Sequence, residues 1–322
     1  MSSALGDWPS PAAGGNLAVV VPTSLEWLPF AAIAFQRART VLADDADFRF
    51  FILVAEEDFI AAQEIIAASG KVDLSSLVAF PSQLLDGLPI TERWTAASWY
   101  RLFLPELEPL GSFDRILLLG VDAYVMRSPL AALCVDFKES IAAVCEPRKS
   151  PSYSSPLFGG PRATYFNADV LLYNTSAWKA RGETAQLVLM AKGVGQLLPY
   201  SDQDVLNYWF RGRWWALPPE CNWIPALHSA YDRPGLRSAL IVQWAGRQKP
   251  WKEPLAPPVR MTWRWRASYR LFWGSATSAE RLRGLSLGLL DRALLDLLAY
   301  YVPTVRSLLT DFRSMVRKRK NS

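Results

Sequence analysis

Histidine and cysteine are scarce in this sequence of 322 residues. There is one histidine, His228, and there are three cysteines, Cys134, Cys145 and Cys221. The cysteines are odd in number and show no paired short spacing, which argues against a disulfide framework and against a zinc site. His228 lies outside any motif, so we expect it to be structural or exposed. A reducing compartment agrees with this cysteine usage.

Long apolar runs are also absent. The first apolar run, residues 17–21, is far shorter than a signal-peptide core or the roughly 20 residues of a spanning helix. No basic segment precedes it, and the leucine-rich stretch 283–298 is interrupted by Asp291, Arg292 and Asp296. We therefore expect a cytoplasmic enzyme.

The charge balance is nearly even. The net charge is only +5, and much of the excess lies in the basic residues of segment 313–320. The basicity is therefore local, and such a tail favours anionic surfaces. The hydrophobic content of 51% is enough to bury a large core, as one domain with an appendage or as two domains.

Short apolar runs alternate with helical segments through the first half of the chain. We predict strands at residues 17–21, 48–54, 115–119, 140–145 and the apolar end of 165–174, and helices at 25–42, 58–69 and from 202. Asp58 is a candidate N-cap, and Gly70 is a candidate stop signal. This order predicts an α/β fold. Asp122 follows the strand 115–119 directly, where open α/β sheets bind ligands.

Five segments in fixed order carry a resemblance to a known family: Tyr100-Arg-Leu102, Arg115-Ile-Leu-Leu-Leu-Gly-Val-Asp122, Tyr165-Phe-Asn-Ala-Asp169, Ser201-Asp-Gln-Asp-Val-Leu-Asn207 and Trp244-Ala-Gly-Arg-Gln-Lys-Pro-Trp251. Together they resemble glycosyltransferase family 8 over residues 17–252. The resemblance implies a GT-A fold, a mixed and mostly parallel sheet flanked by helices. It also implies a UDP-sugar donor and transfer with retention of anomeric configuration.

The resemblance assigns five residues to the sugar end of the donor. Arg101 corresponds to an arginine that contacts the donor, and Asn167 to the residue that faces the donor sugar. Asp202 and Gln203 correspond to the pair near the reacting carbon. Glu146 falls where the family often places an acidic contact to the sugar. Since an amide is a poor nucleophile, Gln203 is expected to stabilise the transition state, with the acceptor attacking from the front face.

The resemblance assigns four more residues to the nucleotide. Lys249 corresponds to a lysine that touches the diphosphate, and Gly246 permits close backbone approach. Thr23 and Ser24 lie at the usual uridine-binding turn, although the acidic residues expected there are missing. Taken singly, such residues are more often structural: an arginine on a surface, an aspartate as a helix N-cap, or a turn with a packed indole. The ordered set favours the functional interpretation.

The sequence departs from the family at its cation site. The family binds a divalent ion through Asp-x-Asp at the end of the central strand and through a later histidine. Gly120 replaces the first aspartate here, and Gln243 replaces the histidine, which leaves Asp122. Asp169 stands where the family usually has glycine. Mn²⁺ or Mg²⁺ binding is therefore expected to be weakened or dispensable.

Three interpretations of this departure stay open. A cation can still be held by Asp122, water and phosphates. Alternatively, Arg101, Arg247 and Lys249 neutralise the diphosphate directly. In the third, the chain is a catalytically degenerate protein that binds nucleotide-sugar or glycan. The favoured function is transfer of a hexose, glucose or galactose, from a UDP-sugar to an acceptor glycan such as lipopolysaccharide or exopolysaccharide.

The composition shifts after residue 254. We expect a flexible N-terminus (1–15), a GT-A catalytic domain (16–254) and an aromatic, basic helical appendage (255–322). Arginine alternates with aromatics between Trp263 and Trp273, which nucleic-acid-binding segments also do, but no other feature supports that interpretation. The appendage is expected to dock peripherally on the anionic inner face of the cell membrane and to reach a glycolipid acceptor. Packing of its leucines on the catalytic domain is the alternative.

Overall fold

The structure, a computed structural model, describes residues 16–42, 48–90, 95–145, 165–194, 199–227, 233–252, 256 and 258–273. Its contacts divide the chain into two units. The first unit runs to Trp223 and includes residues Ala239–Gln243. The second comprises residues Ile224–Ser238 and those from Trp244 onward. This division falls after Gln243 and does not test the expected domain boundary at residue 254, which stays a prediction.

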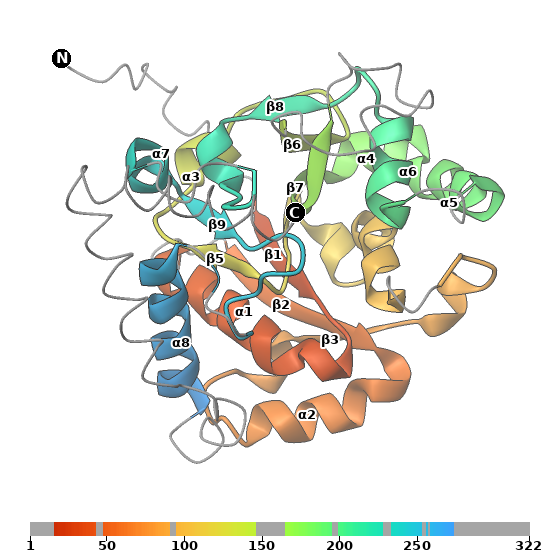
Figure 1. The fold of residues 1–322 in the computed structure, drawn as a ribbon. Helices are drawn as coiled ribbons and strands as arrows, with labels where there is room; N and C mark the ends of the chain where they lie inside the picture. The colour runs from red at the N-terminus through yellow and green to blue at the C-terminus, as the bar shows by residue number, and fades with distance from the viewer. Residues whose placement is uncertain are drawn as a thin grey trace, which may run out of the picture. The chain divides into compact units, whose positions relative to one another are not determined.

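The first unit is built on a seven-stranded sheet with the order β3-β2-β1-β4-β7-β6-β8 (Figure 1). Its strands are β1 (Leu17–Pro22), β2 (Phe48–Ala55), β3 (Leu77–Phe80), β4 (Arg115–Leu119), β6 (Ile141–Cys145), β7 (Phe166–Asn174) and β8 (Trp215–Leu217). Only β7 runs antiparallel to its two neighbours, β4 and β6. A separate antiparallel pair is formed by β5 (Ala123–Val125) and β9 (Ile241–Gln243). The expected mixed, mostly parallel α/β sheet is confirmed.

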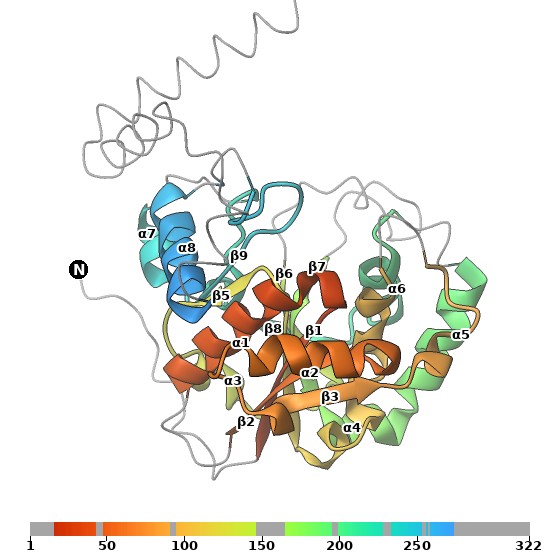
Figure 2. The same ribbon diagram turned by 90° about the horizontal axis from the view of Figure 1, so that it is seen from below.

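Helices cover both faces of this sheet. They are α1 (Leu28–Leu42), α2 (Phe59–Ala67), α3 (Leu130–Leu133), α4 (Thr175–Arg181), α5 (Glu183–Val194) and α6 (Ser201–Trp209), with 3-10 turns between them. Helix α1 packs on β1 and β2, and α2 packs on β2 and β3 (Figure 2). Helices α4, α5 and α6 gather on the side of β7 (Figure 1). Because both faces are covered, every residue of β1 is buried, which explains its unbroken apolar sequence.

The antiparallel pairing of β4 and β7 brings the predicted site residues together. Leu119, at the end of β4, pairs with Val170 near the start of β7. Beyond this pair, the N–H of Gly120 donates to the carbonyl of Asp169 at 2.7 Å. The end of the central strand and the start of a segment some fifty residues later in the sequence therefore lie at one point of the sheet.

Helix α2 begins at the predicted place but without the side-chain cap. Asp58 precedes the helix as its N-cap residue, but its side chain makes no capping hydrogen bond. A short 3-10 turn, Glu56–Asp58, leads into the helix instead, so Asp58 is itself in a helical backbone conformation. Gly70 lies beyond the end of α2 with φ of 61°, a left-handed conformation that glycine adopts easily.

In the second unit, α7 (Arg233–Ser238) and α8 (Val259–Trp273) are described. Helix α8 covers the segment in which arginine and aromatic residues alternate, and its helical period buries some of these side chains and exposes others. Trp265 and Tyr269 are buried and stack at 5.5 Å, whereas Arg264 and Arg270 are exposed. The indole of Trp265 is therefore a packed side chain and not a membrane contact.

The buried Arg266 of α8 fixes the turn that contains Lys249. Its Nε donates to the carbonyl of Pro250 at 2.8 Å, and its Nη2 donates to that of Lys252 at 2.9 Å. This helix is thus part of the structure around the Lys-Pro-Trp motif. The remainder of the predicted appendage, residues 274–322, and residues 1–15 lie outside the described residues. Among those described, none belongs to a helix long and apolar enough to cross a membrane.

Candidate active site

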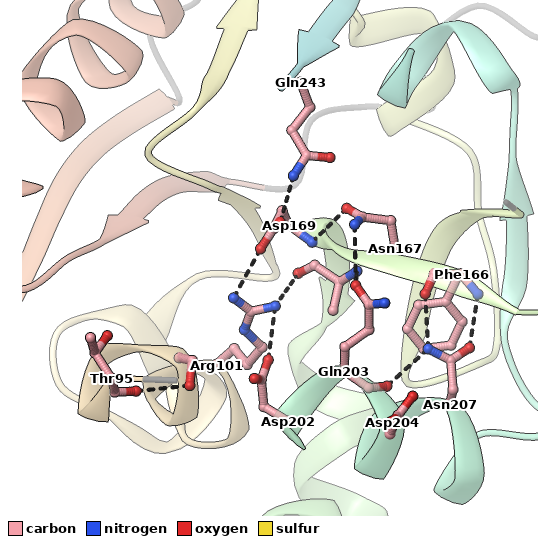
Figure 3. Close-up of polar contacts among 12 residues, drawn as sticks. Thr95, Arg101, Phe166, Asn167, Asp169, Asp202, Gln203, Asp204, Asn207 and Gln243 are labelled. Atoms are coloured by element: carbon pink, nitrogen blue, oxygen red, sulfur yellow. Dashed lines mark hydrogen bonds and ion pairs between the residues drawn. The ribbon is translucent and has the colours of Figure 1, made fainter. Parts of the chain in front are cut away.

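Polar side chains from five segments meet beyond the end of β4 in the first unit. The segments are the 3-10 turn η5 (Ala96–Leu102), the end of β4, the start of β7, the start of α6 and the end of β9. Figure 3 shows Arg101 between Asp169 and Asp202, with Gln243 directed at Asp169 from the opposite side. Most of the sequence-predicted sugar-end residues therefore come together.

Arg101 is the cation of this cluster. It is 8% exposed, and it contacts Asp169 through Nη2 and Asp202 through Nη1, each at 3.1 Å. Nη1 also donates to the carbonyl of Ala168 at 2.8 Å. Burial opposes the charge of the guanidinium, but the carboxylates of Asp202 and Asp169 outweigh it and raise the pKa of Arg101. The structure shows Arg101 bound to two carboxylates and a backbone carbonyl. Its predicted contact with the donor therefore stays a prediction.

Asp202 is buried at the start of α6. Desolvation raises the pKa of its carboxyl to about 6, although the nearby Arg101 acts in the opposite direction. The residue before it, Ser201, has φ of 47°, an uncommon conformation for a residue other than glycine. At the place where the sequence predicts the reacting centre, the structure thus has a carboxylate whose charge is destabilised by burial, next to a residue with an uncommon backbone conformation.

Gln203 and Asn167 form a fixed pair of amides. The Oε1 atom of Gln203 accepts from Asn167 Nδ2 at 3.1 Å and from the N–H of Ala168 at 3.0 Å. Its Nε2 donates to the hydroxyl of Tyr165 at 2.9 Å. The network fixes the orientation of the Gln203 amide and ties α6 to the start of β7 (Figure 3).

Gln243 faces two carboxylates. It is fully buried and lies opposite Ala123 in the β5–β9 pair, next to Asp122. Its Nε2 donates to Asp169, and it lies 3.5 Å from Oδ1 of Asp122, which is 3% exposed. Its Oε1 is buried and makes no hydrogen bond within the described part of the chain.

These groups fit a hard divalent cation. Two carboxylates and a neutral amide oxygen are the oxygen ligands that Mg²⁺ and Mn²⁺ prefer, usually completed by water and phosphate. Asp122, Asp169 and Gln243 would hold such an ion, and bound there it would neutralise negative charge on a diphosphate. The described residues contain no group of three His, Cys, Asp or Glu side chains around one point, so a closed cage made only of such ligands is absent from this part of the chain.

Four supporting residues were not predicted. Tyr165 donates to the buried Asp204, and Asp204 also accepts from the N–H of Tyr200 at 2.8 Å. Asn207 exchanges two hydrogen bonds with the backbone of Phe166, each at 2.8 Å. Asn222 donates to Asn167 at 3.1 Å. The first three lie inside the recognised motifs and could have been found there, whereas Asn222 belongs to no motif.

The other predicted residues are Thr23, Ser24, Glu146, Gly246 and Lys249. Thr23 is buried after β1 and donates to the carbonyl of Ser24, whose buried hydroxyl has no partner within the described ranges. Glu146 lies outside the described residues. Gly246 and Lys249 belong to the second unit, where Lys249 donates to the carbonyl of Trp244 at 2.9 Å and Gly246 has φ of 86°. This left-handed conformation is itself a reason for glycine at that position.

A mixed sheet with carboxylate and amide side chains beyond the end of its central strand is the arrangement of GT-A sugar transferases. The comparisons agree with this class. A family model described as glycosyl transferase family 8 matches residues 39–254, and the chain belongs to that family.

Two of the curated relatives are named as lipopolysaccharide transferases. The chain is 28% identical to the lipopolysaccharide 1,2-glucosyltransferase of Escherichia coli (strain K12) over 188 residues, 55% of each chain. It is also 28% identical to the lipopolysaccharide 1,3-galactosyltransferase of Salmonella typhimurium over 189 residues, 54% of this chain and 55% of the relative. The chain thus spans about half the length of these curated relatives.

Solved structures share the fold. A crystal structure of the galactosyltransferase LgtC with donor and acceptor sugar analogues matches with a TM-score of 0.65 at 20% identity, covering 82% of this chain and all of that one. The bifunctional glycosyltransferase WbbM matches with a TM-score of 0.61 at 16% identity, covering 84% of this chain and 52% of that one. At these identities the likeness establishes the GT-A fold alone.

The buried carboxyl of Asp202 predicts an unusual pH dependence of stability. Its pKa rises from 3.8 to about 6 on folding, so its contribution to stability is present below pH 3.8 and is lost as the pH rises through about 6. Between pH 4 and pH 7, the unfolding free energy of wild type should therefore fall relative to that of Asp202→Asn. Denaturant unfolding at several pH values measures it, with the exposed Asp136→Asn as the matched control. A difference that does not change with pH would contradict the prediction.

Proposed function

We propose that this chain transfers a hexose, glucose or galactose, from a UDP-sugar to an acceptor glycan with retention of anomeric configuration. The observation that carries the proposal is the buried network in which Arg101, Asp202 and the paired amides of Asn167 and Gln203 meet beyond the end of β4. These are the positions that the family resemblance assigns to the sugar end of the donor.

The chemistry of transfer requires such groups. Cleaving the bond between sugar and UDP develops negative charge on the diphosphate and positive charge on the sugar carbon. Oxygen atoms of Asp202 and Gln203 suit the positive end, and their fixed orientation means that little reorganisation is needed during the reaction. The ammonium of Lys249 suits the diphosphate, a role that rests on the resemblance.

The acceptor is a lipid-linked glycan in this proposal. Two of the relatives are named as lipopolysaccharide transferases, one for glucose and one for galactose, which supports both the hexose and a lipopolysaccharide-type acceptor. Attachment of the enzyme to the inner face of a membrane would bring it to such an acceptor. The basic segment 313–320 is the part of the sequence that supports this attachment.

Donor binding and turnover test the proposal directly. We expect calorimetry to detect binding of UDP and of UDP-glucose or UDP-galactose, and we expect release of UDP on incubation with the preferred sugar. The assay is run with EDTA and with Mn²⁺. No heat with UDP or either sugar under both conditions would remove the nucleotide-sugar function. Binding without turnover on any acceptor would instead favour a degenerate binding protein.

Gln203→Ala should lower donor turnover by about 10- to 1000-fold, the range for loss of one preorganised contact to a transition state. The affinity for UDP should change little, because the amide lies in the network at the sugar end. Gln186→Ala, an exposed glutamine on α5, is the matched control. Thermal unfolding of both variants separates loss of structure from loss of chemistry. Unchanged turnover in Gln203→Ala would place the reacting centre elsewhere.

Membrane attachment is tested with a shortened chain. The truncation should begin after Trp273, because Arg266 of α8 holds the turn that contains Lys249, and removal of α8 would also disturb that turn. The chain ending at Trp273 should keep UDP binding and lose sedimentation with anionic liposomes. Sedimentation equal to that of the full chain would show that residues 274–322 are not the anchor.

A further inference from the structure

Gly120 and Asp169 compete for one volume at the end of β4. A Cβ atom built on Gly120 would lie 3.0 Å from the Cβ of Asp169, 3.3 Å from its carboxyl carbon and 3.0 Å from Oδ1 of Asp122. Such distances are shorter than ordinary van der Waals contact. A carboxylate on residue 120 would therefore need the space in which the side chain of Asp169 lies.

The two positions are joined by the backbone. The N–H of Gly120 donates to the carbonyl of Asp169 at 2.7 Å, so the residues are neighbours across antiparallel strands. Side chains of such neighbours lie within contact distance of each other. A carboxylate can thus be supplied from either strand to nearly the same place beside Asp122.

The cluster carries more negative than positive charge. It contains three carboxylates, on Asp122, Asp169 and Asp202, and among its described members the one cation is the guanidinium of Arg101. Asp122 and Asp202 are each 3% exposed. Buried charges in proteins are normally paired or bound to a metal ion, and a divalent cation matches this excess of two negative charges.

Gln243 provides a neutral oxygen at the same place. The amide is fully buried against Asp122 and Asp169, and its Oε1 is without a hydrogen-bond partner among the residues described. Rotation about the last side-chain bond exchanges Oε1 with Nε2 and leaves the rest of the residue in place. The same amide can therefore donate to the carboxylates without an ion and offer its oxygen to an ion.

We propose that Asp169 supplies the carboxylate that Gly120 lacks, and that Asp122, Asp169 and the Oε1 of Gln243 form a divalent-cation site. In this chain, one ligand comes from the adjacent strand β7, whereas the family has it at the end of β4. This inference rests on the proposed function in one respect, because the donor diphosphate would complete the coordination. The carboxylate of Asp169 is the ligand that the family resemblance does not provide.

Binding of Mn²⁺ to the full chain, followed by electron paramagnetic resonance with and without UDP, tests the site independently of turnover. Wild type should bind Mn²⁺ more tightly with UDP present. Asp169→Asn has nearly the same shape, and it should weaken Mn²⁺ binding by about 10-fold or more, since even supporting residues of metal sites have effects of this size. Asp136→Asn, on the exposed surface, is the control and should bind as wild type does.

Exchange of the two residues provides a sharper test. Gly120→Asp alone should bind Mn²⁺ more weakly than wild type and unfold at a lower temperature, because two carboxylates then crowd one volume. The double variant Gly120→Asp with Asp169→Gly should restore binding to within about 3-fold of wild type, a non-additivity expected of residues in contact. Additive effects of the two changes would contradict a shared volume.

The outcomes separate this inference from the proposed function. Equal Mn²⁺ affinity of wild type and Asp169→Asn would show that Asp169 is not a ligand. Calorimetric binding of UDP together with no Mn²⁺ signal would overturn the cation site and leave the proposed function standing. Absence of UDP binding would overturn the proposed function, while Mn²⁺ binding that depends on Asp169 would still support the site.

Discussion

The ion pairs of Arg101 hold the site together. One guanidinium joins three segments that are distant in the sequence, because it contacts Asp169 on β7, Asp202 on α6 and the backbone carbonyl of Ala168 from its own position in η5. Removal of one partner from a buried ion pair typically costs about 3–5 kcal/mol, since the remaining charge has no compensation. This arginine therefore compensates the buried charge of Asp202, while the side chain of Asp169 is 29% exposed. In the described structure the buried side chain of Arg101 contacts acidic groups and backbone, and its contact with the donor stays a prediction.

Much of the fold follows from local patterns in the sequence. The runs 17–21, 48–54 and 115–119 are almost wholly apolar because both faces of the sheet are covered, with Arg49 and Arg115 as their polar residues, and each run corresponds to a strand in the structure. The end of β4 could be located because the run stops at Gly120. The partners of the site residues could not be located in this way. Sequence periodicity describes only neighbouring residues, so it cannot show that Gly120 and Asp169 are close. The antiparallel pairing of β4 with β7 in the structure shows that the two residues share space.

The same limit applies to the segment between Trp263 and Trp273. Its composition alone suggested a surface for membranes, but the helical period turns Trp265 and Tyr269 inward and Arg264 outward. Composition records which side chains are present, whereas packing depends on which of them share a face. The hydrogen bonds of Arg266 to the carbonyls of residues 250 and 252 fix the turn that contains Lys249, which composition could not indicate. Helix α8 stabilises a motif that the sequence interpretation had assigned to a different domain.

The contact between Gly120 and Asp169 also affects how motifs are searched. A search that scores one alignment column at a time counts the glycine at 120 as a loss and the aspartate at 169 as an unrelated change. Taken together, the two changes leave the number of carboxylates beside Asp122 the same. This is possible because neighbouring antiparallel strands reach the same point from opposite directions. A search that scores residues 120 and 169 together, as a pair on neighbouring strands, would count this chain among the family members that have a full set of carboxylates. During evolution, the exchange passes through a chain with both carboxylates or with neither, so the two columns are expected to change together.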